Sequence, residues 1–98
     1  MTDLPADWPF HDDSPNVPVI TTRGVIDGTE WIALVTLDEE EGDWQFIGPS
    51  GARTDEALIV ALRRVYERDP SIGELADLPP GGKAWRDGPD APWQRGPQ

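Results

Sequence analysis

The stretch that decides the fold is EWIALVTL, residues 30–37, which is followed after six residues by WQFI, residues 44–47. Alternate positions of the first run place apolar side chains on both faces, which is typical of a strand covered on two sides. In the second run, Trp44 and Phe46 fall on one face. The six residues between the runs, 38–43, are mostly acidic and suit an exposed loop. The two runs therefore predict an antiparallel hairpin in which residues 30–37 form a central strand.

Apolar residues after the hairpin recur at helical spacing between residues 55 and 68. Leu58, Leu62 and Val65 form one stripe, which is the pattern of a helix that packs one face against a core. Thr54 suits the N-cap position, because a threonine hydroxyl accepts a hydrogen bond from the first helical turn. The pattern predicts the main helix of the protein over residues 55–68.

Shorter segments complete the expected fold. Residues 17–22 are β-branched, and Pro18 restricts them to an edge strand or to the start of a strand. Asp27-Gly28 is a turn signal, residues 69–75 predict a short helical turn, and residues 83–86 predict a last short strand. The expected fold class is α+β: a small antiparallel sheet of three to four strands with one main helix packed on one face and irregular, Pro-rich termini.

The 98 residues divide into three parts by composition. Residues 1–16 form an irregular acidic arm, which Trp8 and Phe10 can pin to the body. Residues 17–86 form a single α+β domain, and residues 87–98 form a Pro/Gly-rich tail. This size suits one small domain with a thin core.

The charge balance excludes several classes of function. Eight Lys and Arg face nineteen Asp and Glu, for a net charge of −11, and residues 1–50 carry −10 of it. Such a chain lacks the basic surface that direct nucleic-acid binding requires, and it lacks the cations that an anionic membrane attracts. There is no apolar run of membrane-spanning length and no basic leader, so we expect a cytoplasmic protein.

Catalytic and metal sites find little support in the residue types. The chain has no Cys and one His, His11, so it offers no Cys-ligated zinc site and no thiolate nucleophile. His11 lies in the irregular arm without a recognisable nucleophile, Ser50 lacks the spacing of a nucleophile elbow, and residues 81–83 are too short for a phosphate loop. We therefore expect no catalytic residues, no cofactor and no metal, and a small enzyme is the least favoured class.

The strongest local signal is the acidic loop of residues 38–43. Several carboxylates at a hairpin tip can steer and bind a cationic protein, and a tryptophan beside them can anchor the contact. The candidate partner-binding residues are Asp38, Glu39, Glu40, Glu41, Asp43 and Trp44. The alternative is a solvated loop that keeps a small protein soluble. Calcium binding is a weaker hypothesis, because the loop lacks the order of ligands of an EF-hand.

The order of features between Val19 and Arg86 resembles a family of immunity-protein-like domains from bacterial polymorphic toxin systems. The segments that carry the resemblance are residues 25–28, GDWQF at 42–46, DPSI at 69–72, LPPG at 78–81 and AWR at 84–86. The resemblance implies an α+β protein that binds and neutralises a toxin encoded nearby. It implies no catalytic residues.

Charge and resemblance together favour a non-catalytic, immunity-like protein that binds a basic toxin or effector. The alternative is an acidic mimic of nucleic acid, or a regulator of a DNA-binding protein. Pairing of an edge strand near Val19 would also allow a homodimer.

Overall fold

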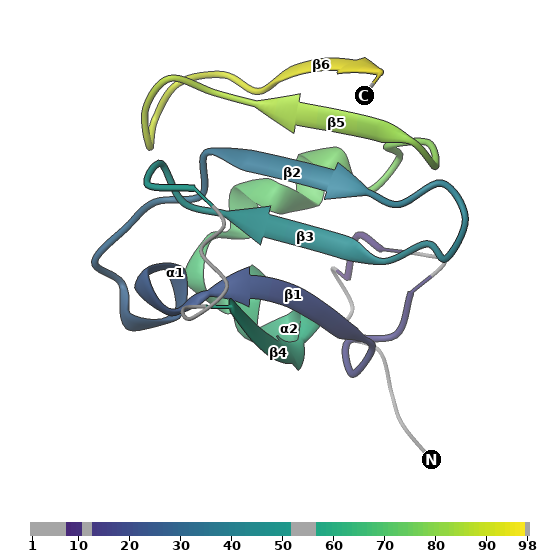
Figure 1. Cartoon of the computed structure of the whole chain (residues 1–98), viewed down its shortest axis with the longest axis horizontal. Helices are drawn as coiled ribbons and strands as arrows, with labels where there is room; N and C mark the ends of the chain where they lie inside the picture. The colour runs from purple at the N-terminus through teal and green to yellow at the C-terminus, as the bar shows by residue number, and fades with distance from the viewer. Residues whose placement is uncertain (1–7, 11–12, 52–56, 98) are drawn as a thin grey trace.

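The computed structural model describes residues 8–10, 13–51 and 57–97 (Figure 1). Its centre is a six-stranded sheet in the order β4-β1-β3-β2-β5-β6. The strands are β1 Pro18–Thr22, β2 Leu34–Leu37, β3 Trp44–Ile47, β4 Ala57–Ala61, β5 Gly82–Trp85 and β6 Gln94–Pro97. The helices are α1 Arg23–Asp27, α2 Leu62–Arg68 and the 3₁₀ helix η2 Pro70–Leu75. None of these helices is long and apolar enough to cross a membrane.

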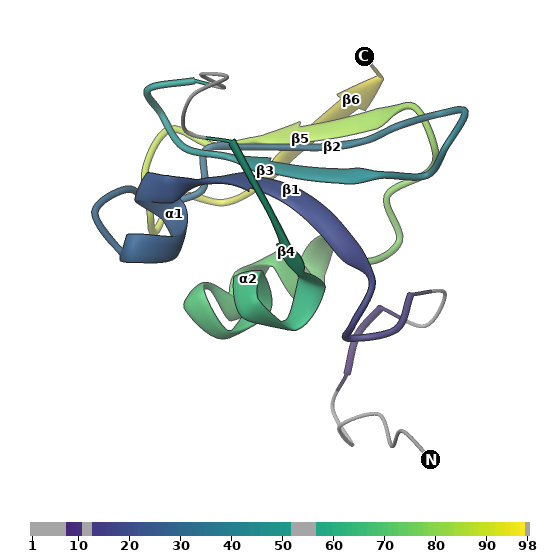
Figure 2. The same cartoon turned by 60° about the horizontal axis from the view of Figure 1, so that its bottom comes forward.

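The described helices lie on one face of the sheet, below it in Figure 2. The core fills the space between the two layers. Its sheet side consists of alternate strand residues such as Val35 and Phe46, and its helix side includes Leu62, Val65 and Ile72, all fully buried. No described helix covers the opposite face of the sheet.

The hairpin predicted from residues 30–47 is confirmed. Strands β2 and β3 pair antiparallel, with Val35 opposite Phe46 and Leu37 opposite Trp44. Strand β2 lies inside the sheet between β3 and β5, as expected of a central strand, although it begins only at Leu34. The hairpin therefore fixes the centre of the fold from local sequence alone.

The expected sheet of three to four antiparallel strands is wrong. The sheet has six strands, and it is mixed because β1 runs parallel to β3 while the other neighbours are antiparallel. The tail, which we expected to be irregular, supplies β6, and Trp85 pairs there with Gln94. Strand β1 is an inner strand rather than an edge, and Pro18 is its first residue, where a missing N–H is tolerated.

The expected main helix over residues 55–68 is also wrong. Residues Ala57–Ala61 form strand β4, and the helix is limited to the seven residues of α2. The five residues of β4 are all apolar, so they fit a strand as well as a helix, and pairing of all five with β1 decides between the two. Thr54, the expected cap, lies outside the described residues.

Two clusters hold the terminal segments to the body. The aromatic cluster consists of Trp8, Phe10, Trp44 and Tyr66, whose rings meet mostly edge to face at 5.3–6.5 Å between centroids. The arginine cluster consists of Arg86, Asp69, Ser71 and Trp93. The aromatic cluster contacts the start of β3, so it also braces the acidic loop.

Candidate functional site

The acidic loop, residues 38–43, joins β2 to β3 at the right-hand end of the sheet in Figure 1. Its two ends are joined by a hydrogen bond in which the Asp38 N–H donates to the carbonyl of Asp43 at 2.9 Å. The Gly42 N–H donates to the Asp38 carbonyl at 3.1 Å, with Gly42 at a φ of 71°. That conformation favours glycine, so the sequence itself builds a tight tip.

The loop carboxylates divide into one structural group and four exposed ones. The Asp38 carboxylate turns back into the loop and accepts hydrogen bonds from the backbone N–H groups of Glu40 at 3.1 Å and Glu41 at 2.6 Å. This is the turn-forming role of aspartate, and it orders the tip. The side chains left exposed are those of Glu39, Glu40, Glu41 and Asp43.

No described Lys or Arg lies within salt-bridge distance of the loop carboxylates. The described ion pairs join Arg86 to Asp69 and Arg95 to Asp77, away from the loop. The four exposed carboxylates thus concentrate negative charge on one tip without a described internal counter-charge. A tip of this kind attracts cationic groups over roughly one Debye length, about 8 Å at physiological salt.

Trp44, a candidate partner-binding residue, is buried, because only 2 % of it is exposed. Its indole N–H donates to the Asp13 carboxylate at 3.1 Å, and its ring stacks on Phe46 with 5.8 Å between centroids. Trp44 therefore anchors the base of the loop. The alternation of Trp44 with Phe46 placed both on one face, and this signal was enough to predict burial.

A proline notch lies beside the acidic loop and was not predicted from the sequence. It is a hollow of about 350 Å³ lined by residues 78–82 of the turn before β5 and by Arg95 and Gly96 of β6. The Gly81 N–H donates to the Leu37 carbonyl at 2.8 Å, and a side chain at Gly81 would stand 3.5 Å from Glu39. The notch thus gives the acidic tip an apolar neighbour.

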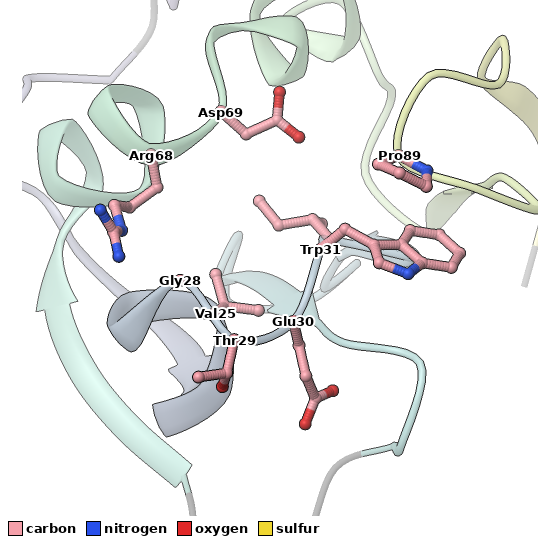
Figure 3. Close-up of a pocket in the computed structure, with 9 residues that line it drawn as sticks. Val25, Gly28, Thr29, Glu30, Trp31, Arg68, Asp69 and Pro89 are labelled. Carbon is pink, nitrogen blue, oxygen red and sulfur yellow. The ribbon is translucent and has the colours of Figure 1, made fainter.

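A second hollow, of about 550 Å³, opens at the other end of the sheet (Figure 3). The segment after α1 and the end of α2 form its walls, with the Trp31 ring and Pro89 on one side. Its acidic side chains have partners in the protein: Asp69 pairs with Arg86, and Glu30 accepts from the Ser50 hydroxyl at 2.8 and 2.9 Å. Both carboxylates are therefore engaged by partners within the protein.

The remaining candidates are Ser50, the turn of residues 81–83 and His11. Ser50 is a turn residue bonded to Glu30, and Lys83 lies over the Trp85 ring at 5.5 Å from its centroid. His11 lies outside the described residues. In the part of the chain that the structure describes, no three His, Cys, Asp or Glu side chains are grouped so as to hold a metal ion.

Comparison with protein-family models, with curated proteins and with solved structures found no match. The resemblance to immunity-protein-like domains thus stays a prediction from sequence.

Proposed function

We propose that the protein is a non-catalytic, immunity-like protein that acts in the cytoplasm by binding and neutralising a cationic toxin or effector. The partner is a protein whose basic surface meets the acidic loop. The observation that carries the proposal is the set of four exposed carboxylates on an ordered tip.

Fixed charges bind better than mobile ones, because less side-chain and backbone entropy is lost on association. The loop is fixed from within by Asp38 and from below by the buried Trp44. Charge of one sign on such a tip raises the rate of encounter with a basic surface, and it does so less as salt rises. This supports rapid, salt-sensitive binding.

The same geometry supports a protein partner over mimicry of nucleic acid. A mimic presents carboxylates in two spaced rows, as phosphates are spaced along a duplex. The exposed carboxylates of the acidic loop gather instead on one tip, beside an apolar hollow. Mixed acidic and apolar surface suits a basic protein with an exposed aliphatic or aromatic side chain.

The test is capture of partners on the tagged full chain from the cells that encode it, with elution by stepwise salt. The loop variant carries Glu39→Gln, Glu40→Gln and Glu41→Gln. The matched control carries Asp27→Asn, Glu67→Gln and Asp90→Asn, which remove the same charge from exposed sites. Residue 27 ends α1 and residue 90 lies between β5 and β6. Helix α1 and the connection from β5 to β6 lie at the opposite end of the sheet from the loop (Figure 1).

We expect one dominant basic protein that the wild type and the control retain and the loop variant loses. Kinetic measurement with the purified partner should place most of the loss in the association rate. Equal loss in both triple variants would assign the binding to net charge alone. Retention by the loop variant would overturn the proposal.

A further inference from the structure

The proline notch is an apolar hollow whose shape is fixed by the chain around it. Pro79 and Pro80 lie in the turn before β5, and each proline ring locks its own backbone φ. The turn is closed by the Gly82 N–H, which donates to the Pro79 carbonyl at 2.8 Å. Strand β5 pairs with β6, whose Arg95 and Gly96 line the other side of the notch. The notch is therefore preformed, and a ligand that enters it loses less free energy to ordering of the protein.

The acidic loop packs against this turn through Glu39. Loop and turn lie together at the right-hand end of the sheet in Figure 1, and the Gly81 N–H donates to the Leu37 carbonyl at 2.8 Å. Three carbon atoms of the Glu39 side chain, the carboxylate carbon included, lie 3.5–3.8 Å from the position that a Cβ atom at Gly81 would occupy. Gly81 has a φ of 83°, which favours glycine, so no side chain separates the two segments. The Glu39 carboxylate thus stands at the rim of the notch.

The charged side chains around the notch are engaged unequally. Arg95 lines the notch, but its guanidinium lies 2.8 Å from the Asp77 carboxylate and donates to the Glu74 carbonyl. No described Lys or Arg lies within salt-bridge distance of Glu39. Among the described residues, the notch therefore combines apolar walls with one exposed carboxylate that has no cationic partner.

We propose that the proline notch binds an arginine side chain of the cationic protein partner, with the aliphatic stem in the notch and the guanidinium on the Glu39 carboxylate. This inference rests on the proposed function for the class of partner, and it adds the residue type that the partner uses. Arginine supplies both parts that the site needs. Its methylene stem packs on apolar surface, and its planar cation bonds a carboxylate through two N–H groups.

Charge and hydration select arginine over other side chains. An aliphatic or aromatic side chain would fill the notch and leave Glu39 without a counter-charge. Lysine would supply the charge, but its ammonium is compact and strongly hydrated, so its transfer to an apolar wall costs more than that of a guanidinium. The volume of about 350 Å³ is at the lower end of ligand pockets, which suits one side chain rather than a longer segment.

The experiment is an amide NMR titration of the full chain with n-propylguanidinium chloride, which reproduces the arginine side chain from Cβ outward. The probe runs from about 0.5 to about 50 mM, because a single side chain binds in the millimolar range. Sodium chloride keeps the ionic strength constant. The amides of Gly81, Gly82 and Gly96 report on the notch, and those of Gly28 and Ile32 report on the larger hollow of Figure 3.

Two further probes and two variants separate the parts of the contact. Guanidinium chloride carries the charged head without a stem, and n-butylammonium chloride reproduces the lysine side chain. Glu39→Gln removes the charge at the rim of the notch. The matched control is Glu67→Gln on α2. Both glutamates are exposed, so both variants should keep the fold, and the amide spectrum outside the notch checks this.

We expect n-propylguanidinium to shift the three notch amides saturably and to bind more tightly than either other probe. Glu39→Gln should weaken this binding about threefold, as the loss of an exposed ion pair does, and Glu67→Gln should leave it unchanged. The proposal is overturned if guanidinium or n-butylammonium binds the notch as tightly, because the stem or the planar head then contributes nothing. Binding that Glu39→Gln does not weaken overturns it as well, and so do shifts confined to Gly28 and Ile32.

This titration and the capture of partners can fail separately. If the notch does not bind the probe while the loop variant loses a captured protein, the notch proposal fails and the acidic-loop proposal stands. If the probe binds the notch and no basic protein is captured, the proposed function fails, and the notch remains a site for alkylguanidinium groups.

Discussion

The aromatic cluster and the arginine cluster perform the same task with different forces. Each ties a terminal segment to the body through a tryptophan, Trp8 at the N-terminal side and Trp93 at the C-terminal side. In the aromatic cluster Phe10 is 1 % exposed and touches the rings of Trp8, Trp44 and Tyr66. In the arginine cluster the central group is a guanidinium, which polar partners hold and the Trp93 ring covers.

The arginine cluster satisfies a buried cation almost completely. The Arg86 side chain donates from Nε to the Ile32 carbonyl at 2.8 Å, from Nη1 to the Ser71 hydroxyl at 3.1 Å and from Nη2 to the Asp69 carboxylate. The Trp93 ring covers it, with 4.2 Å from the guanidinium carbon to the ring centroid. A buried charge of this kind specifies one arrangement of its partners, whereas apolar contacts tolerate many.

The largest effect should come from Phe10→Ala. Removing the ring opens a cavity beside three other rings, so we expect unfolding to become easier by about 3–5 kcal/mol. The measurement is urea unfolding followed by tryptophan fluorescence. Phe10→Leu is the control, and it should cost less than about 1.5 kcal/mol because it keeps most of the volume. A cost below about 1 kcal/mol for Phe10→Ala would mean that the N-terminal segment contributes little to the core.

Asp69→Asn should have the next largest effect, about 3 kcal/mol. The amide keeps the shape and leaves the Arg86 cation buried without its counter-ion. This cost is at the low end of the range for a buried ion pair, because the Asp69 side chain is 24 % exposed. Water can therefore partly replace the carboxylate charge as a partner of Arg86. Asp77→Asn, which breaks an exposed pair, is the matched control and should leave the unfolding midpoint unchanged. Equal effects of the two variants would show that burial does not strengthen the Arg86 pair.

Trp93→Leu should cost about 1–2 kcal/mol. The substitution removes the face of the indole from the guanidinium and breaks the hydrogen bond from its N–H to the Ser71 hydroxyl at 3.2 Å. Trp93→Phe keeps an aromatic face, so the difference between the two variants isolates the cation–π contact. If leucine and phenylalanine are equivalent in the same unfolding experiment, the ring serves only as apolar cover.

Local sequence could predict some elements of this protein and not others. The hairpin of β2 and β3 was predictable because both partners and their period of two lie within one short stretch. Strand β4 was not, because its apolar residues fit two periods and its partner β1 lies about forty residues earlier. The acidic loop was found from composition. The burial of Arg86 left no sequence signal, since Asp69 and Ser71 meet it only through the fold.

The smallest effect is expected where the C-terminal segment makes an exposed ion pair. Arg95 Nη1 lies 2.8 Å from the Asp77 carboxylate, and the hydrogen bond and charge of Arg95 lower the pKa of Asp77 from its usual value of 3.8. A pKa lowered by folding gives stability that is present above the unfolded pKa and lost as the pH falls through the folded pKa. Any contribution of Asp77 therefore disappears below pH 3.8.

Because Asp77 is exposed, we expect Arg95→Gln to change the pKa of Asp77 and to leave the unfolding midpoint of the protein constant. Carboxyl NMR should show the pKa of Asp77 rising in Arg95→Gln and staying low in Arg95→Lys. An unchanged titration in Arg95→Gln would mean that the ion pair is not populated in solution, and that the arginine cluster alone supplies the ionic attachment of the C-terminal segment.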